Sequence, residues 1–171
     1  VDPVLRTSGG DSLLDEEGLD ALNRQLLPLA DLITPNLDEE PMLQLPASSA
    51  VLLKGGHSGQ ATCVDRLRLS DGRCFEYAAN RVKTENLRGT GCALSAGIAA
   101  YISLGFELPE ACRMAKALLH EALLRNAKKS FKEVVIGLAL IKSWGIADSI
   151  SKKVVIFSLT VLSILNKPIL N

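Results

Sequence analysis

The sequence is short of aromatic residues and carries no excess of either charge, and both shortages narrow the choice of partners. Only 4% of its 171 residues are Phe, Trp or Tyr, which is little for a protein that stacks single-stranded bases on aromatic rings. Nineteen Lys and Arg residues balance nineteen Asp and Glu residues, so the formal net charge is zero. Nucleic acids and anionic membrane surfaces attract proteins mainly through positive charge. We therefore expect neither of them to be a partner.

Clustered metal ligands and long apolar runs are also missing. His57 and His120 are the only histidines, and none of the four cysteines belongs to a Cys-x-x-Cys motif, so the sequence indicates no zinc site. No apolar run reaches the roughly 18 to 20 residues that a membrane-spanning helix needs. Neither a secretory signal nor a disulfide spacing is evident. These absences predict a cytoplasmic protein without a membrane span.

The sequence does contain an alternation of helix and strand patterns. The spacing of apolar residues and the positions of Gly and Pro predict helices over 12–27, over 93–104 and from 108 onward, and strands over 29–34, 50–53, 63–69 and 74–78. The last two strands flank a Ser-Asp-Gly-Arg turn and should form a hairpin. Such alternation is typical of an α/β fold with a mainly parallel sheet.

Polar residues follow three of the expected strand segments. Asp2, Asn36 and Lys54 each come at or just after the end of an apolar stretch. In α/β sheets, ligands bind beyond the carboxyl ends of the strands. We therefore expect these three side chains to converge on one site.

The segment Gly89-Thr90-Gly91-Cys92 opens onto a helix rich in small residues. Glycines allow a close approach of the backbone to a ligand, and the first amides of a helix have no partner within it. The segment is therefore typical of a phosphate site at a helix N-terminus. Leu94 stands where a dinucleotide fingerprint needs its third glycine, and no Gly-Lys-Ser/Thr tripeptide of a P-loop is present. The alternative is that Gly89 and Gly91 only shape the start of the helix.

Three side chains have both a chemical and a structural interpretation. At the helix N-terminus, Cys92 is expected to have a lowered pKa and to act as a base, or to contribute only its amide, or to be an inert core residue. Lys54 can neutralise a phosphate or can be an ordinary surface lysine. Glu39 can hold magnesium near phosphates, directly or through water, or can belong to a solvated acidic run.

Four motifs together resemble the ribokinase-like superfamily and, within it, the hydroxymethylpyrimidine/phosphomethylpyrimidine kinases of thiamine biosynthesis. They are Val1-Asp2-Pro3-Val4, Thr34-Pro35-Asn36-Leu37-Asp38-Glu39, Leu53-Lys54-Gly55-Gly56-His57 and Gly89-Thr90-Gly91-Cys92-Ala93-Leu94-Ser95-Ala96. Most of the superfamily has Asp where this chain has Cys92, whereas the pyrimidine kinases and some related pyridoxal kinases have Cys. The resemblance covers only the C-terminal part of such a kinase.

The resemblance implies a partial three-layer α/β/α fold, truncated on its N-terminal side, and a set of residue roles. Gly89, Thr90, Gly91 and Cys92 would surround the γ-phosphate of ATP, with Gly91 and Cys92 at the catalytic position and Cys92 as the base. Lys54 would contact the ATP phosphates, and Glu39 with Asp2 would organise Mg²⁺. The implied substrates are hydroxymethylpyrimidine and its monophosphate. The alternatives are a nucleotide-binding remnant without turnover and a pyridoxine or pyridoxal kinase. A homodimer is possible by the same resemblance.

Two stretches depart from the family pattern. Residues 35–49 contain three prolines and leave little room for the helix expected there. Residues 129–171 match nothing in the usual ending of the family. We therefore predict a kinase-like part over 1–128, followed by an atypical hydrophobic and basic tail over 129–171.

Overall fold

A four-stranded sheet organises the part of the chain that the computed structural model describes, which is residues 1–7, 10–57, 61–84 and 88–127. Its strands lie in the order β1-β2-β3-β4. The strands are β1 (Leu32–Ile33), β2 (Ala50–Leu53), β3 (Thr62–Arg68) and β4 (Cys74–Asn80). The hairpin β3–β4 and the strand β2 match their expected positions closely, and Gly72 has the positive φ of 88° that the turn requires.

The sheet is mixed, so the prediction of a mainly parallel sheet is wrong. β1 pairs with β2 in parallel, whereas β2–β3 and β3–β4 are both antiparallel. The reason lies in the connections. A parallel crossover needs about a dozen residues or more, and the segment 54–61 between β2 and β3 is shorter than that.

The first helical region differs from the expected helix over 12–27. α1 spans Glu16–Ala21 and continues as a π-helical turn over Leu22–Leu26 and a 3₁₀ turn over Leu27–Leu29. Its start is set by Asp15, whose carboxylate accepts a hydrogen bond from the Gly18 amide at 2.8 Å, as an N-cap does. The continuing turn takes up the first residue of the strand expected over 29–34, and β1 is correspondingly short.

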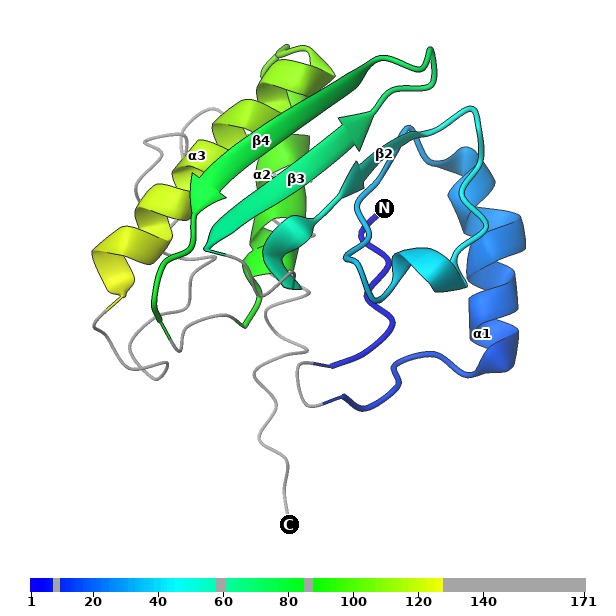
Figure 1. Cartoon of the computed structure of the whole chain (residues 1–171). Coiled ribbons are helices and arrows are strands. Elements are labelled where there is room, and N and C mark those ends of the chain that lie inside the picture. The colour runs from blue at the N-terminus through cyan, green and yellow to red at the C-terminus, as the bar shows by residue number, and fades with distance from the viewer. Residues whose placement is uncertain (8–9, 58–60, 85–87, 128–171) are drawn as a thin grey trace.

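Two long helices form the layer behind the strands in Figure 1. α2 (Thr90–Ser103) begins after Gly89, which has a φ of 74°, and ends before Gly105, which has a φ of 90°. α3 (Leu108–Asn126) has Pro109 in its first turn, as expected. Both helices pack on the same face of the sheet, and they share a core of strand and helix side chains, which are Leu52, Leu67, Leu94, Ile98, Ala111, Cys112, Ala115 and Leu119.

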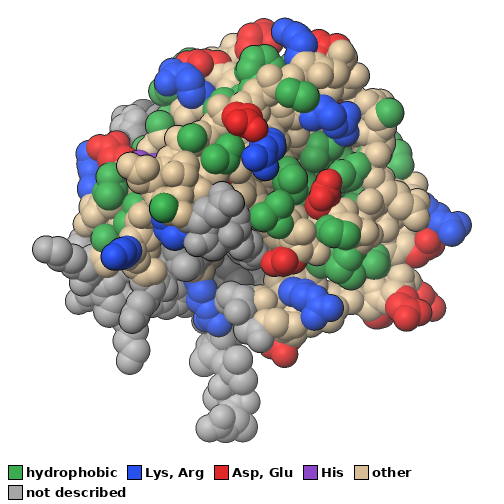
Figure 2. Space-filling view, viewed as in Figure 1, with side chains coloured by type: hydrophobic (Ala, Val, Ile, Leu, Met, Phe, Trp, Pro, Cys, Tyr) green, Lys and Arg blue, Asp and Glu red, His purple; other side chains and the backbone are tan. Residues whose placement is uncertain are grey.

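The opposite face of the hairpin is exposed. Arg66 and Arg68 alternate with the buried Asp65 and Leu67 along β3, as expected when a strand has one buried face. Figure 2 shows acidic and basic side chains mixed on this side of the molecule.

Residues 35–49 form no α-helix. Their only regular element is a 3₁₀ turn over Glu40–Met42, which confirms that the helix of the family pattern does not fit there. The expected tail over 129–171 lies outside the described residues. Within the described residues, no helix is both long and apolar enough to cross a bilayer.

Candidate functional site

Lys54 and Asp2 form an ion pair where β2 ends. Lys54 Nζ donates to Asp2 Oδ1 at 2.7 Å, and the two side chains are only 10% and 16% exposed. The Lys54 amide donates to Pro35 O at 2.8 Å and so extends the pairing of β1 with β2 by one bridge, to Asn36. The side chains of Asp2 and Lys54 therefore meet at the strand ends, whereas Asn36 meets Lys54 through the backbone and its side chain accepts within its own turn.

The N-terminus of α2 lies directly against this lysine. A Cβ atom added to Gly91 would be 3.2 Å from Lys54 Nζ, which is tighter than an ordinary contact. The Ala93 amide donates to Gly89 O at 2.8 Å, so the helical hydrogen bonding begins there and the amides before it belong to the open end of the helix. Lys54 and the start of α2 are therefore neighbours, and their common role as a phosphate site stays a prediction.

Two hydroxyl groups connect Asp2 to α2, and the sequence analysis assigned neither a role. Thr34 Oγ1 donates to Asp2 Oδ1 at 3.1 Å and lies 2.8 Å from Ser95 Oγ. Ser95 Oγ also lies 3.1 Å from Gly91 O. Each hydroxyl has one proton, so when Thr34 donates to Asp2, Ser95 donates either to Thr34 Oγ1 or to Gly91 O. Thr34 is only 2% exposed. The chain of hydroxyls fixes the orientation of the Asp2 carboxylate relative to the first turn of α2.

The thiol of Cys92 does not behave as its place at a helix N-terminus suggests. Its pKa is raised to about 11, first because the thiol is largely buried and then because the negative charge of Asp2 and a hydrogen bond to Asp2 favour the protonated form. The positive charge of Lys54 acts in the opposite direction but is outweighed. The expectation of a lowered pKa is therefore wrong, because burial and the Asp2 carboxylate raise the pKa.

Glu39 is buried, so the alternative of a solvated acidic run does not hold for this residue. It is 8% exposed, and Glu39 Oε2 accepts a hydrogen bond from the Asn36 amide at 2.8 Å. Asn36 Oδ1 accepts from the amides of Asp38 and Glu39, both at 2.8 Å, and so fixes the turn. The charge of Glu39 also contributes, less than burial and Asp2 do, to the raised pKa of Cys92.

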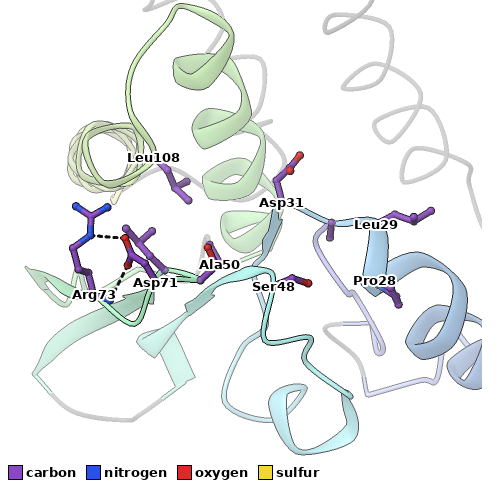
Figure 3. Close-up of a pocket in the computed structure, with 11 residues that line it drawn as sticks. Pro28, Leu29, Asp31, Ser48, Ala50, Asp71, Arg73 and Leu108 are labelled. Atoms are coloured by element: carbon purple, nitrogen blue, oxygen red, sulfur yellow. Dashed lines mark hydrogen bonds and ion pairs between the residues drawn. The ribbon is translucent and has the colours of Figure 1, made fainter.

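A hollow of about 400 Å³ lies away from these residues, at the opposite end of β2. Figure 3 shows Ser48 and Ala50 at the start of β2, with Leu108 and the Asp71–Arg73 ion pair beside them. Asp2, Glu39, Lys54 and Cys92 do not line it. Both side chains of the Asp71–Arg73 pair are exposed. The residues that line the hollow include no buried group of charged side chains comparable to that around Lys54.

The fold is that of the ribokinase-like small-molecule kinases. The solved structure of a pyridoxal kinase from Lactobacillus plantarum matches the chain with a TM-score of 0.65 and 23% identity, over 86% of this chain and 61% of that one. The structure of the pyridoxal kinase from Staphylococcus aureus in complex with AMP-PCP and pyridoxal matches with a TM-score of 0.60 and 25% identity, over 71% of this chain and 50% of the other.

The chain belongs to the phosphomethylpyrimidine kinase family, whose model matches residues 1–135. A hydroxymethylpyrimidine/phosphomethylpyrimidine kinase from Haemophilus influenzae is 35% identical over 144 residues, which cover 72% of this chain and 54% of that protein. The chain thus spans about half the length of the curated relative it matches. The predicted boundary at residues 128 and 129 stays a prediction.

Proposed function

We propose that the chain provides the ATP-phosphate site of a kinase that phosphorylates hydroxymethylpyrimidine and then its monophosphate in thiamine biosynthesis. The observation that carries the proposal is the position of Lys54, whose ammonium group lies between the Asp2 carboxylate and the glycine at the start of α2. The relatives that carry the name of this activity support the substrate.

The proposed reaction depends on positioning and charge more than on covalent chemistry, as in other phosphoryl transfers. Lys54 and the amides of Gly89, Thr90 and Gly91 would bind the β- and γ-phosphates of ATP and stabilise the charge that develops during transfer. Gly91 carries no side chain that could separate the phosphate from the lysine. Asp2 and Thr34 hold Lys54 and the helix start in one arrangement before ATP binds.

Asp2 and Glu39 fit the requirements of a magnesium site. Mg²⁺ is usually held by one or two carboxylates together with substrate phosphates and waters. Asp2 and Glu39 are two largely buried carboxylates whose charges both act on Cys92 at the start of α2. When bound, Mg²⁺ would neutralise phosphate charge during the transfer. Asp2, which is paired with Lys54, and Glu39, which is fixed by the Asn36 amide, are the residues that would hold it.

We assign Cys92 to the position of the base beside the substrate hydroxyl. Burial and the charges of Asp2 and Glu39 raise its pKa to about 11 and keep the thiol protonated near neutral pH. A positive charge that compensates these two carboxylates would have to lower the pKa before Cys92 could accept the proton. General-base groups contribute about 10²- to 10⁴-fold to a rate, so Cys92→Ala should lower kcat by at least about 100-fold. Cys92→Asp introduces the acid that most of the superfamily has at this position. This variant should retain more activity than Cys92→Ala. Phosphorylation of the pyrimidine that Cys92→Ala leaves unchanged would refute the assignment.

Two other functions remain as competing outcomes of one assay. ATP consumption is measured with purified protein and hydroxymethylpyrimidine, its monophosphate or pyridoxal as acceptor. Turnover with pyridoxal alone would favour a pyridoxal kinase, the activity named for several solved structures of similar fold. ATP binding without consumption in any of the three mixtures would favour a nucleotide-binding remnant.

The proposal includes a cytoplasmic location and a homodimer. The location follows from the lack of a secretory signal and of a disulfide spacing in the sequence, and the dimer follows from the family resemblance. Sedimentation of the purified chain tests the dimer, and a single species of monomer mass at high concentration would contradict it.

A further inference from the structure

A second ion pair lies beneath the turn that carries Lys54. Lys116 Nζ, from α3, donates to Asp65 Oδ2, from β3, at 2.7 Å. The side chains are 13% and 3% exposed. The pair lies on the sheet face that packs against the helices, and it makes none of the contacts described above for the Lys54 site.

The other oxygen of Asp65 holds the residue that follows Lys54. The Gly55 amide donates to Asp65 Oδ1 at 2.8 Å, and this hydrogen bond is buried. A Cβ atom on Gly55 would be 2.0 Å from Val64 O, so the turn lies directly on the backbone of β3. Contacts with two consecutive residues of β3 therefore determine where the chain goes immediately after Lys54.

Lys116 makes this arrangement tenable inside the protein. A buried carboxylate is costly unless a positive charge and hydrogen bonds compensate it. Gly55 uses one oxygen of Asp65 and Lys116 uses the other. Lys116 follows Ala115 on α3, close to the buried Cys112 and Leu119. The ion pair thus links α3 to the turn through the carboxylate of Asp65.

We propose that Asp65 and Lys116 are positioning residues for the phosphate site. By holding Gly55, they fix the ammonium group of Lys54 at the start of α2 and so set the affinity for the triphosphate of ATP. This inference rests on the function proposed above. Neither residue touches the phosphate position itself.

Two double variants separate positioning from general support of the fold. D65N/K116M removes both buried charges but keeps an amide oxygen that can accept from Gly55. D65L/K116M removes the same charges and replaces the acceptor with an apolar group of similar size, a change that folded proteins commonly tolerate. Glu76→Gln is the matched control. Glu76, on β4, forms an exposed ion pair with Arg66, which lies next to Asp65 on β3 but on the opposite face of the sheet.

The affinity of the full chain for ATP with Mg²⁺ is measured by calorimetric titration, and the fold is checked by circular dichroism. We expect D65L/K116M to bind about tenfold more weakly than wild type, which is the cost of one lost hydrogen bond to a fixed group. D65N/K116M should stay within about threefold of wild type because its hydrogen bond is kept. Glu76→Gln should bind as wild type does. Equal affinities of the two folded double variants would overturn the proposal.

Amide hydrogen exchange at Gly55 makes the inference independent of the proposed function. Faster exchange at Gly55 in D65L/K116M than in D65N/K116M is the expected result. If the wild-type chain binds no ATP, the proposed function fails, and this exchange still decides whether Asp65 fixes the turn. Equal exchange in the two variants would show that it does not. If D65L/K116M fails to fold, slower exchange in D65N/K116M than in Asp65→Ala supports the proposal, and equal exchange refutes it.

Discussion

At the scale of single residues, the site consists of charges that compensate one another in a mostly buried place. Lys54 has Asp2 as its ion-pair partner, and Asp2 also accepts from Thr34. Replacing Lys54 with alanine leaves the Asp2 carboxylate without its cation. Because removing one partner of a buried pair is strongly destabilising, we expect Lys54→Ala to lower the free energy of unfolding by up to about 3 kcal/mol. We also expect ATP to bind at least about tenfold more weakly.

Urea unfolding and calorimetric titration measure the two effects separately. Arg24→Ala is the control, because Arg24 pairs with Asp20 on the surface with both side chains more than half exposed. Exposed pairs contribute about 1 kcal/mol or less. If Lys54→Ala binds ATP as tightly as Arg24→Ala does, Lys54 is not a phosphate ligand.

At the scale of elements, the Lys54–Gly56 turn distinguishes two adjacent glycines. A Cβ atom on Gly55 would be 2.0 Å from Val64 O, whereas one on Gly56 would have nothing within 4 Å. Backbone of a central strand cannot move aside at small cost. We therefore expect Gly55→Ala to fold poorly or to lose several kcal/mol of stability, and Gly56→Ala to stay within about 0.5 kcal/mol of wild type. Thermal unfolding followed by circular dichroism makes the comparison, and similar midpoints for the two variants would contradict the close packing of Gly55 on β3.

Element positions were predictable wherever a local pattern decides them. The hairpin follows from alternation around a glycine turn, and the end of α2 follows from Gly105. The direction of β3 was not predictable in this way, because it depends on how few residues connect it to β2 rather than on its own sequence. The start of α1 depends on Asp15 as N-cap, a signal that the sequence does contain.

The residues of the site that belong to local motifs were predictable, and the long-range pairs between them were not. Motifs brought Asp2, Lys54 and Gly91 together correctly, since each lies where a strand ends or a helix begins. The contact of Thr34 with Ser95 joins residues 61 positions apart, and that of Asp65 with Lys116 joins residues 51 positions apart. No local pattern specifies such pairs. A charged residue at an inward position of β3, two residues before the buried Leu67, was the available signal for Asp65.

At the scale of the whole molecule, the packing of the hairpin on α3 should make the free energy of unfolding fall as pH rises through the alkaline range. Burial raises the pKa of Cys112 to about 12, with a further contribution from the charge of Asp65. Burial also raises the pKa of Tyr77 to about 12, and its hydroxyl donates to Pro109 O at 2.8 Å. Both groups are neutral when protonated. In the unfolded chain they lose their protons near their ordinary pKa values of 9.0 and 10.0.

Above pH 9 the unfolded state therefore binds fewer protons than the folded state, and stability falls as pH rises. From this thiol alone we expect a loss of about 1.4 kcal/mol per pH unit between about pH 9 and pH 12. Urea unfolding at several pH values, with reductant present, measures the slope. Cys112→Ala lowers stability at every pH through lost packing, but its slope should be shallower than that of wild type. Cys74→Ser, at an exposed cysteine, should keep the wild-type slope.

Parallel slopes for wild type and Cys112→Ala would mean that the buried thiol is not what couples the fold to pH, because only a group with different pKa values in the two states can change the slope.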